Sequence, residues 1–202
     1  MIDARREVTL GILAGGRAQR LGGRDKAWLL RDGQPLVQRL AQALAPSLAA
    51  VLVSANRALP RYADAGLQAV PDRVAAARDA ERSLGPIAGL DALAAACATS
   101  WLLTVPVDLC MLPPTLPALL VAAGGDGAGA YAEDDDGVQP LVALYRIDAL
   151  RPALAAALAA ERYAPSALQR QLDMVRVRLP GVVLGNLNTP QDLRAAGILP
   201  AP

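Results

Sequence analysis

A six-residue apolar run, Val8 to Leu13, leads directly into a loop rich in glycine that extends to Lys26. A continuous apolar run of this length is typical of a strand buried on both faces, as in a parallel sheet covered by helices. Glycines let backbone N–H groups approach an anion closely, and the arginines and lysine of this loop add positive charge. The chain therefore begins with a buried strand and a loop suited to a polyphosphate.

Lys26 is the only lysine in the chain, and every other fixed cation is an arginine. An ammonium group is a compact point charge, whereas a guanidinium group is a planar fork. A single lysine in such a chain indicates that this position needs the smaller head group. The alternative is that the lysine is incidental in an arginine-biased composition.

The composition limits the classes of protein to which the chain can belong. Its 202 residues, 53% of them hydrophobic, predict one domain with one buried core. A formal net charge of +1, with only two tryptophans and four tyrosines, excludes a nucleic-acid surface. A charged N-terminus and the lack of a long apolar stretch predict neither a signal peptide nor a membrane span. Cys97 and Cys110 lack metal-ligand spacing, so we expect free thiols and a cytoplasmic location.

The chain contains no histidine. This excludes Ser-His-Asp and Cys-His mechanisms and removes the commonest zinc ligand. Phosphoryl and nucleotidyl transfer depend instead on positioning and charge neutralisation, so the composition favours them.

Strand and helix patterns alternate along the chain. Strands are predicted at 8–13, 50–54, 67–70, 101–105, 128–132 and 140–145, and helices at 35–45, 85–98, 114–123, 147–160, 166–172 and 190–196, with extended segments at 175–178 and 182–184. This alternation predicts a three-layer, Rossmann-like α/β fold with a mostly parallel mixed sheet. Such sheets bind ligands beyond the carboxyl ends of their strands, where the glycine loop and Asp108 both fall.

The glycine loop matches neither the P-loop pattern nor G-x-G-x-x-G. It contains L-A-G-G-x-x-x-R-x-G-G-x-D-K, and through this motif the chain resembles the molybdenum cofactor guanylyltransferases, which join GMP from GTP to the phosphate of molybdopterin. The resemblance covers almost the whole chain. It continues, in the family's order, through Val70-Pro71-Asp72, Gly85-Pro86-Ile87-Ala88-Gly89, Val105-Pro106-Val107-Asp108, Gln139-Pro140-Leu141 and Asn186-Leu187-Asn188-Thr189-Pro190-Gln191-Asp192-Leu193.

The resemblance implies a nucleotidyltransferase fold and a set of site residues. It assigns catalytic roles to Arg20, Lys26 and Asp108, with Mg²⁺ on Asp108, and places Asn186 and Asn188 on the pterin side. The nucleotide-binding residues it implies are Leu13, Ala14, Gly15, Gly16, Lys26, Asn56, Asp72 and Asp108. The part of the chain up to about residue 110 would then bind the nucleotide, and the rest mainly the pterin. Besides GTP and molybdopterin, the implied partners are other cofactor-biosynthesis proteins, acceptor molybdoenzymes and their chaperones.

Residue chemistry alone leaves alternatives open for these positions. Asp108 follows a buried strand, where a carboxylate suits a hard cation, but it could instead cap a helix. Asp72 and Asn56 could be ordinary turn residues.

The C-terminal motif and two other segments have simpler interpretations. Asn186 and Asn188 could cap the helix that starts near Pro190, although Thr189 is better placed for that. We interpret the acidic run 133–136 as a solvated hairpin rather than a metal site. Segment 73–84 is either a lid over the pterin or an insertion.

Three other functions remain open. The first is a CTP-dependent transferase of a pterin or another small phosphate; related cytidylyltransferases tend to carry Ala-Ala-Gly at 14–16, and Gly15 leaves room for a purine. The second is a non-catalytic nucleotide-binding regulator, which would not need Asp108. The third is a dehydrogenase, which should have an acidic residue after the second strand, where this chain has Ser54-Ala55-Asn56.

Overall fold

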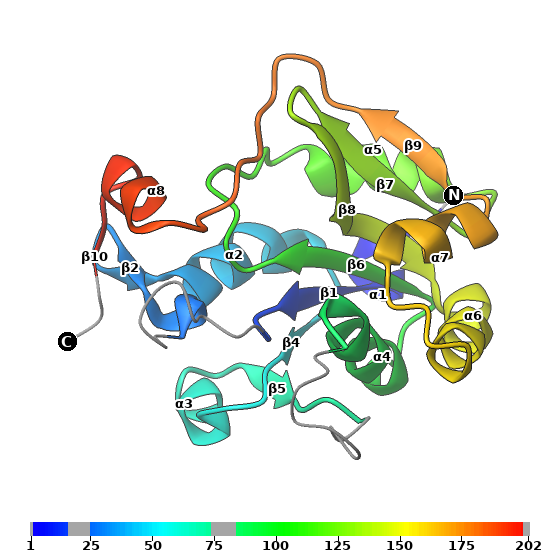
Figure 1. The fold of residues 1–202 in the computed structure, drawn as a ribbon, viewed down its shortest axis with the longest axis horizontal. Coiled ribbons are helices and arrows are strands. Elements are labelled where there is room, and N and C mark those ends of the chain that lie inside the picture. The colour runs from blue at the N-terminus through cyan, green and yellow to red at the C-terminus, as the bar shows by residue number, and fades with distance from the viewer. Residues whose placement is uncertain (1, 16–24, 74–83, 200–202) are drawn as a thin grey trace.

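The main feature of the computed structural model is a mixed sheet between two layers of helices (Figure 1). The structure describes residues 2–15, 25–73 and 84–199. Within these ranges one seven-stranded sheet has the order β5-β4-β1-β6-β8-β7-β9. Its strands are β1 (Val8–Leu13), β4 (Ala50–Ser54), β5 (Gln68–Val70), β6 (Trp101–Pro106), β7 (Gly129–Asp134), β8 (Gly137–Arg146) and β9 (Val175–Arg178).

Strands β5, β4, β1 and β6 are parallel, β8 runs antiparallel to β6 and β7, and β9 is parallel to β7. The sheet is therefore mixed and mostly parallel, as the sequence predicts. The chain moves outward from β1 to β4 and β5 and then returns to the other side of β1 as β6. In an open α/β sheet this reversal of direction marks the ligand-binding crevice.

The two faces of the sheet carry separate apolar cores. Helices α2 (Leu36–Leu44) and α5 (Leu116–Gly124) pack with Val8, Leu10 and Ile12 of β1 in one core. Helices α4 (Pro86–Ala96), α6 (Ile147–Ala159) and α7 (Pro165–Gln171) form the other core, with Leu13. The alternation of side chains along β1 thus serves both layers, which confirms the three-layer prediction.

Several short elements lie outside the predicted pattern. They are α1 (Ala4–Glu7), the 3-10 turns η2 (Lys26–Trp28) and η3 (Ala45–Ser47), helix α3 (Leu59–Asp64), and the strands β2 (Leu30–Arg31), β3 (Gln34–Pro35) and β10 (Ile198–Leu199). The last three form a small sheet in the order β10-β2-β3. Asp32 and Gly33 both have positive φ, which suits the two-residue turn that joins β2 to β3. Helix α8 (Pro190–Ala195) agrees with the predicted closing helix.

Segment 182–184, predicted to be extended, forms no strand: Val182 O accepts from Asp135 N in the turn between β7 and β8, and Leu184 O accepts from the N–H groups of Cys110 and Met111 in the loop after β6. Among the described helices, none combines the length and the apolar surface that a bilayer crossing requires.

The acidic run forms the predicted hairpin between β7 and β8, but the prediction that it is solvated is wrong for Asp134. This carboxylate is only 2% exposed. It accepts hydrogen bonds from the backbone N–H of Leu184 (2.8 Å) and Asp136 (3.0 Å) and from Gln139 Nε2 (3.1 Å). Asp134 therefore closes the turn and also ties the C-terminal segment to the hairpin. Within the described ranges, no three His, Cys, Asp or Glu side chains lie close enough together to hold a metal ion.

We expect Asp134→Ala to destabilise the protein by about 1–3 kcal/mol at pH 7, because it leaves buried donors without their acceptor. Burial alone would raise the pKa of Asp134, but the hydrogen bonds from Gln139 and the backbone outweigh it and lower this pKa. The carboxylate thus contributes stability above its unfolded pKa of about 4, and this contribution is lost as pH falls through the folded value. Urea denaturation of wild type and variant from pH 7 to pH 3 should show the difference narrowing below about pH 4.

Asp135→Ala is the matched control, since its exposed side chain should change stability by less than about 0.5 kcal/mol. Equal losses for the two variants would contradict the structural role of Asp134.

Candidate active site

Three backbone hydrogen bonds join the ends of the four parallel strands. The backbone ladder extends one residue past the strands. The three hydrogen bonds run from Val107 N to Leu13 O, from Ala14 N to Ser54 O and from Ala55 N to Val70 O, each at 3.0 Å. The segments that leave β6, β1, β4 and β5 therefore start side by side. We call this the carboxyl edge of the sheet, and it carries, in spatial order, Asp108, Gly15, Asn56 and Asp72.

Lys26 connects two of the predicted site residues. Its Nζ donates to Asp108 Oδ2 at 2.7 Å and to Asn188 Oδ1 at 2.9 Å. The side chains of Lys26 and Asp108 are 21% and 18% exposed, so the ion pair is mostly shielded from solvent but still open on one side. We call these three residues the Lys26 cluster.

The C-terminal motif lies along the loop that carries Asp108. The backbone N–H of Leu187 donates to the Asp108 carbonyl at 2.9 Å, and Asn186 forms an antiparallel bridge with Leu109. The carbonyl of Asn186 also accepts from the N–H of Asn188. The two asparagines are thus held next to Asp108 by the backbone.

The capping alternatives are wrong for Asp108 and Asn188. The next helix after Asp108 is α5, and its N-terminal flanking residue is Thr115. Thr189 caps α8 in a reciprocal capping box with Asp192, as the sequence suggests. The side chains of Asp108 and Asn188 bond to Lys26 instead of to a helix end.

Asn56 and Asp72 form a second pair on the carboxyl edge. Asn56 Nδ2 donates to Asp72 Oδ2 at 2.7 Å, and Asp72 N donates to Asn56 Oδ1 at 2.8 Å. The other carboxylate oxygen, Asp72 Oδ1, is buried and has no hydrogen-bond partner among the described residues. A buried oxygen left in this state is costly unless a ligand donates to it. Asp72 is therefore fixed against Asn56, and its Oδ1 is an acceptor for which the described residues supply no donor.

Gly15 lies beside the Asn56–Asp72 pair. A methyl group placed on Gly15 would be 3.7 Å from Ser54 Oγ and 3.9 Å from Asn56 Nδ2, which are ordinary contacts. The protein can therefore accommodate an alanine here, and the added methyl group would take space next to Asn56. Leu13 and Ala14 contribute their backbone to the strand ends, while Gly16 and Arg20 lie outside the described residues.

An aromatic cluster that the sequence did not predict supports the turn that carries Lys26. The rings of Trp28 and Tyr62 lie 4.9 Å apart, and the Arg61 guanidinium carbon is 4.2 Å from the centre of the Trp28 ring. Asp25 caps the turn by accepting from Ala27 N at 3.0 Å. Burial raises the pKa of Asp25, while burial and the nearby Asp25 charge raise the pKa of Tyr62. The sequence did contain one signal for this cluster: a tryptophan two residues after Lys26, in a chain with few aromatic residues.

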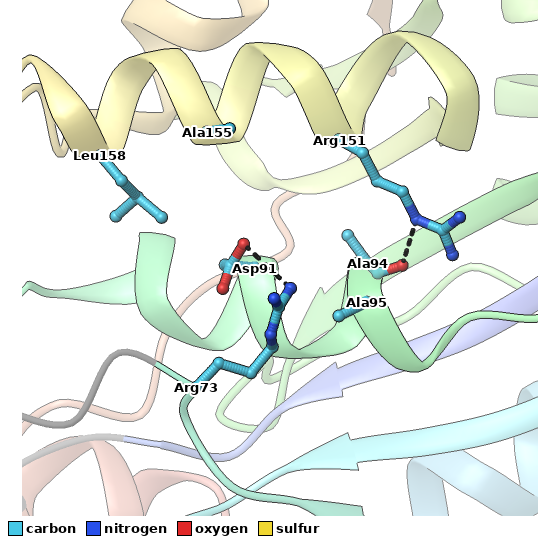
Figure 2. Close-up of a pocket in the computed structure, with 7 residues that line it drawn as sticks. All are labelled: Arg73, Asp91, Ala94, Ala95, Arg151, Ala155 and Leu158. Atoms are coloured by element: carbon cyan, nitrogen blue, oxygen red, sulfur yellow. Dashed lines mark hydrogen bonds and ion pairs between the residues drawn. The ribbon is translucent and has the colours of Figure 1, made fainter.

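A groove of about 640 Å³ lies elsewhere, between α4 and α6 (Figure 2). An ion pair between Arg73 and Asp91 (3.7 Å) lies on one side of it. On the other side Arg151 Nε donates to the carbonyl of Ala94 at 3.0 Å. None of the predicted site residues lines this groove. We therefore place the candidate site on the carboxyl edge.

Comparisons with known proteins show the family to which the chain belongs. The family description "MobA-like NTP transferase domain" matches residues 10–175. The chain is 32% identical over 187 residues to the molybdenum cofactor guanylyltransferase of Yersinia pseudotuberculosis, covering 92% of each chain. The same enzyme from Yersinia pestis is 31% identical with the same coverage.

Two solved structures show the same fold. Molybdopterin-guanine dinucleotide biosynthesis protein A from Archaeoglobus fulgidus has a TM-score of 0.68 at 18% identity, over 93% of this chain and 96% of that one. A 2-C-methyl-D-erythritol 4-phosphate cytidylyltransferase from Thermus thermophilus has a TM-score of 0.66 at 18% identity, over 92% and 95%.

The contact between Trp28 and Tyr62 predicts a measurable coupling in stability. In a double-mutant cycle of Trp28→Leu and Tyr62→Leu, measured by urea denaturation, we expect about 0.5–1.5 kcal/mol of interaction energy from the ring pair. Trp101→Leu is the control, because Trp101 begins β6 at the end of the sheet opposite the carboxyl edge. Its cycle with Trp28 should be additive within about 0.5 kcal/mol. An additive Trp28–Tyr62 cycle would show that the ring pair does not hold the turn.

Proposed function

Because the chain belongs to the MobA-like NTP transferase family, we propose that it transfers GMP from GTP to the terminal phosphate of molybdopterin and releases pyrophosphate. The observation that carries this proposal is the arrangement of the carboxyl edge. A lysine–carboxylate cluster lies at one position, a pair with an acceptor that lacks a donor among the described residues lies at another, and the glycine loop leaves the strand between them. This arrangement supports the proposal of one extended ligand with a phosphate end and a base end.

The chemistry needs no histidine. The terminal phosphate of the pterin is already an anion, so it can attack the α-phosphorus of GTP in line and expel pyrophosphate without a general base. Lys26 and Arg20, with the backbone N–H groups of the glycine loop, would neutralise the β- and γ-phosphates. This lowers the free energy of the charged transition state more than that of the bound substrate.

We propose Mg²⁺ as the cofactor and Asp108 as its protein ligand. The Asp108 carboxylate is a hard oxygen donor, partly exposed, at the edge where the phosphates would lie. Since no group of three His, Cys, Asp or Glu side chains forms within the described ranges, phosphate oxygens and water would complete the coordination shell. A cation bound there would neutralise charge on the phosphates.

The Asn56–Asp72 pair favours guanine over cytosine. Guanine presents adjacent N–H donors on its Watson–Crick edge, which match a carboxylate oxygen that lacks a donor, whereas cytosine presents mainly acceptors beside one amino group. Gly15 leaves space beside this pair for the larger base. The second candidate is a CTP-dependent transferase of the same class, which the open site next to Gly15 makes less suitable.

The pterin would lie on the side of Asn186 and Asn188, within the part of the chain after about residue 110. We infer that the two free cysteines, Cys97 and Cys110, suit a reducing cytoplasm. Other cofactor-biosynthesis proteins, acceptor molybdoenzymes and their chaperones are the protein partners that this reaction would require.

Nucleotide choice tests the proposal. Calorimetry with Mg²⁺ should show GTP binding at least about tenfold more tightly than CTP, a difference of about 1.4 kcal/mol. Gly15→Ala should weaken the binding of GTP more than that of CTP, because the methyl group enters the space beside Asn56. Gly127→Ala is the control, since a methyl group there meets no atom within 4 Å. Tighter binding of CTP by the wild-type protein would replace the guanine assignment with the second candidate.

Asp108→Asn tests the role of the carboxylate. We expect the thermal midpoint to change little and turnover to fall by about two orders of magnitude or more, because a neutral amide is a poor ligand for a hard divalent cation and a weaker partner for Lys26. Pyrophosphate release and thermal unfolding measure the two effects separately. Nearly full turnover in the Asp108→Asn variant would remove Asp108 from the reaction.

A further inference from the structure

The Lys26 cluster draws its residues from three separate segments, and all three meet at the small sheet β10-β2-β3. The turn that carries Lys26 continues into β2. The segment that carries Asn188 continues through α8 into β10, which pairs with β2 through Ile198 opposite Arg31. Figure 1 shows α8, β10 and β2 together at one end of the molecule. Two of the three segments are thus joined by strand pairing.

The third segment, which carries Asp108, is joined to the small sheet by a side chain. Arg31 Nη1 donates to the carbonyl oxygen of Cys110, two residues after Asp108, at 2.6 Å. Arg31 is partly buried, so this hydrogen bond is shielded from competing water. The bond joins β2, the strand after the Lys26 turn, to the loop that carries Asp108, the carboxylate partner of Lys26.

The other supports of this loop come from a different direction. The N–H groups of Cys110 and Met111 donate to the carbonyl of Leu184, and the Asp108 carbonyl accepts from Leu187. These bonds hold the loop against the C-terminal segment, whose own link to the Lys26 turn runs through α8 and β10. Arg31 adds a direct hydrogen bond from the strand after that turn to the loop, beside the bond from Lys26 Nζ to Asp108.

We propose that Arg31 is a positioning residue for the transfer reaction, fixing the separation between Lys26 and Asp108 across the phosphate site. This proposal rests on the proposed function of the Lys26 cluster. When a lysine and a carboxylate act together on one phosphate, the reaction rate falls steeply if the two groups move apart. A displacement near 1 Å can lower the rate about a hundredfold.

The test compares Arg31→Met, which keeps an apolar stem, with Arg31→Lys, which keeps a donor. Arg39→Met is the matched control, because Arg39 pairs with the exposed Asp32 on the same hairpin and reaches no loop of the site. We expect Arg31→Met to lower kcat about tenfold or more while KM for GTP changes less than about threefold. Arg31→Lys should recover most of the rate, and Arg39→Met should match the wild type.

A second measurement reports on the position of Lys26 without any reaction. Because Lys26 is the only lysine, labelling with ¹³C,¹⁵N-lysine gives a single set of side-chain NMR signals. In the Arg31→Met protein these signals should move toward those of an unpaired lysine, and in the Arg39→Met protein they should stay at the wild-type position. Arg31→Gln serves the same comparison if the methionine variant does not fold.

Unchanged kcat or an unchanged Lys26 signal in the folded Arg31 variants would overturn the proposal. If the wild-type protein transfers no GMP, the proposed function fails. The NMR comparison then still decides whether Arg31 positions Lys26.

Discussion

The three hydrogen bonds that continue the parallel ladder past the strand ends determine where the four loops of the carboxyl edge begin. They fix the first residue after β6, β1 and β4 against its neighbour, so each loop leaves the sheet at a defined place and direction. Parallel strands all end on one side, which turns four separate loops into one continuous edge. The two apolar cores make this edge rigid, because β1 and β6 are buried along their whole length on both faces.

Along this edge the structure separates two kinds of polar contact. The Lys26 cluster contains charges that neutralise each other, whereas one carboxylate oxygen of the Asn56–Asp72 pair receives no hydrogen bond from the part of the chain that the structure describes. A cationic lysine that is already oriented by two oxygens needs little rearrangement to meet a phosphate. A carboxylate oxygen that lacks a donor is suited to ligands that carry N–H or O–H groups. In the proposed function, the two contacts correspond to a phosphate half and a base half of the ligand.

The sequence predicted the main sheet, its helices and the position of Asp108, because buried strands and amphipathic helices leave strong periodic patterns. It also placed Lys26 and Asp108 at the same end of the sheet from topology alone. It did not predict the contact between Lys26 and Asn188, which are 162 positions apart and joined only by tertiary structure. The local pattern around Asn188 resembles a helix cap, and the neighbouring Thr189 supplies that cap.

Other features were not predicted, either because the element is too short or because strand register decides which way a side chain points. Two-residue strands such as β2 and β10 are too short to show the alternation of apolar and polar residues that marks a strand, so the sequence did not predict the small sheet. Asp134 is chemically identical to its neighbours Asp135 and Asp136, and only the register of β7 against β8 turns it inward. Trp28 was visible in the sequence, but its partner Tyr62 lies on a six-residue helix that no periodicity revealed.

The distance along the chain between members of the Lys26 cluster also affects how the protein is made. Ribosomes add about 5–20 residues per second, so the 162 positions between Lys26 and Asn188 take roughly 8–32 s to translate. Strand β6 ends at Pro106, so about half of that interval remains once β1, β4, β5 and β6 have all been translated. The lysine gains its last oxygen partner only when the segment around Asn188 has emerged and docked beside Asp108. The four parallel strands are therefore translated roughly 4–16 s before the chain can complete the cluster.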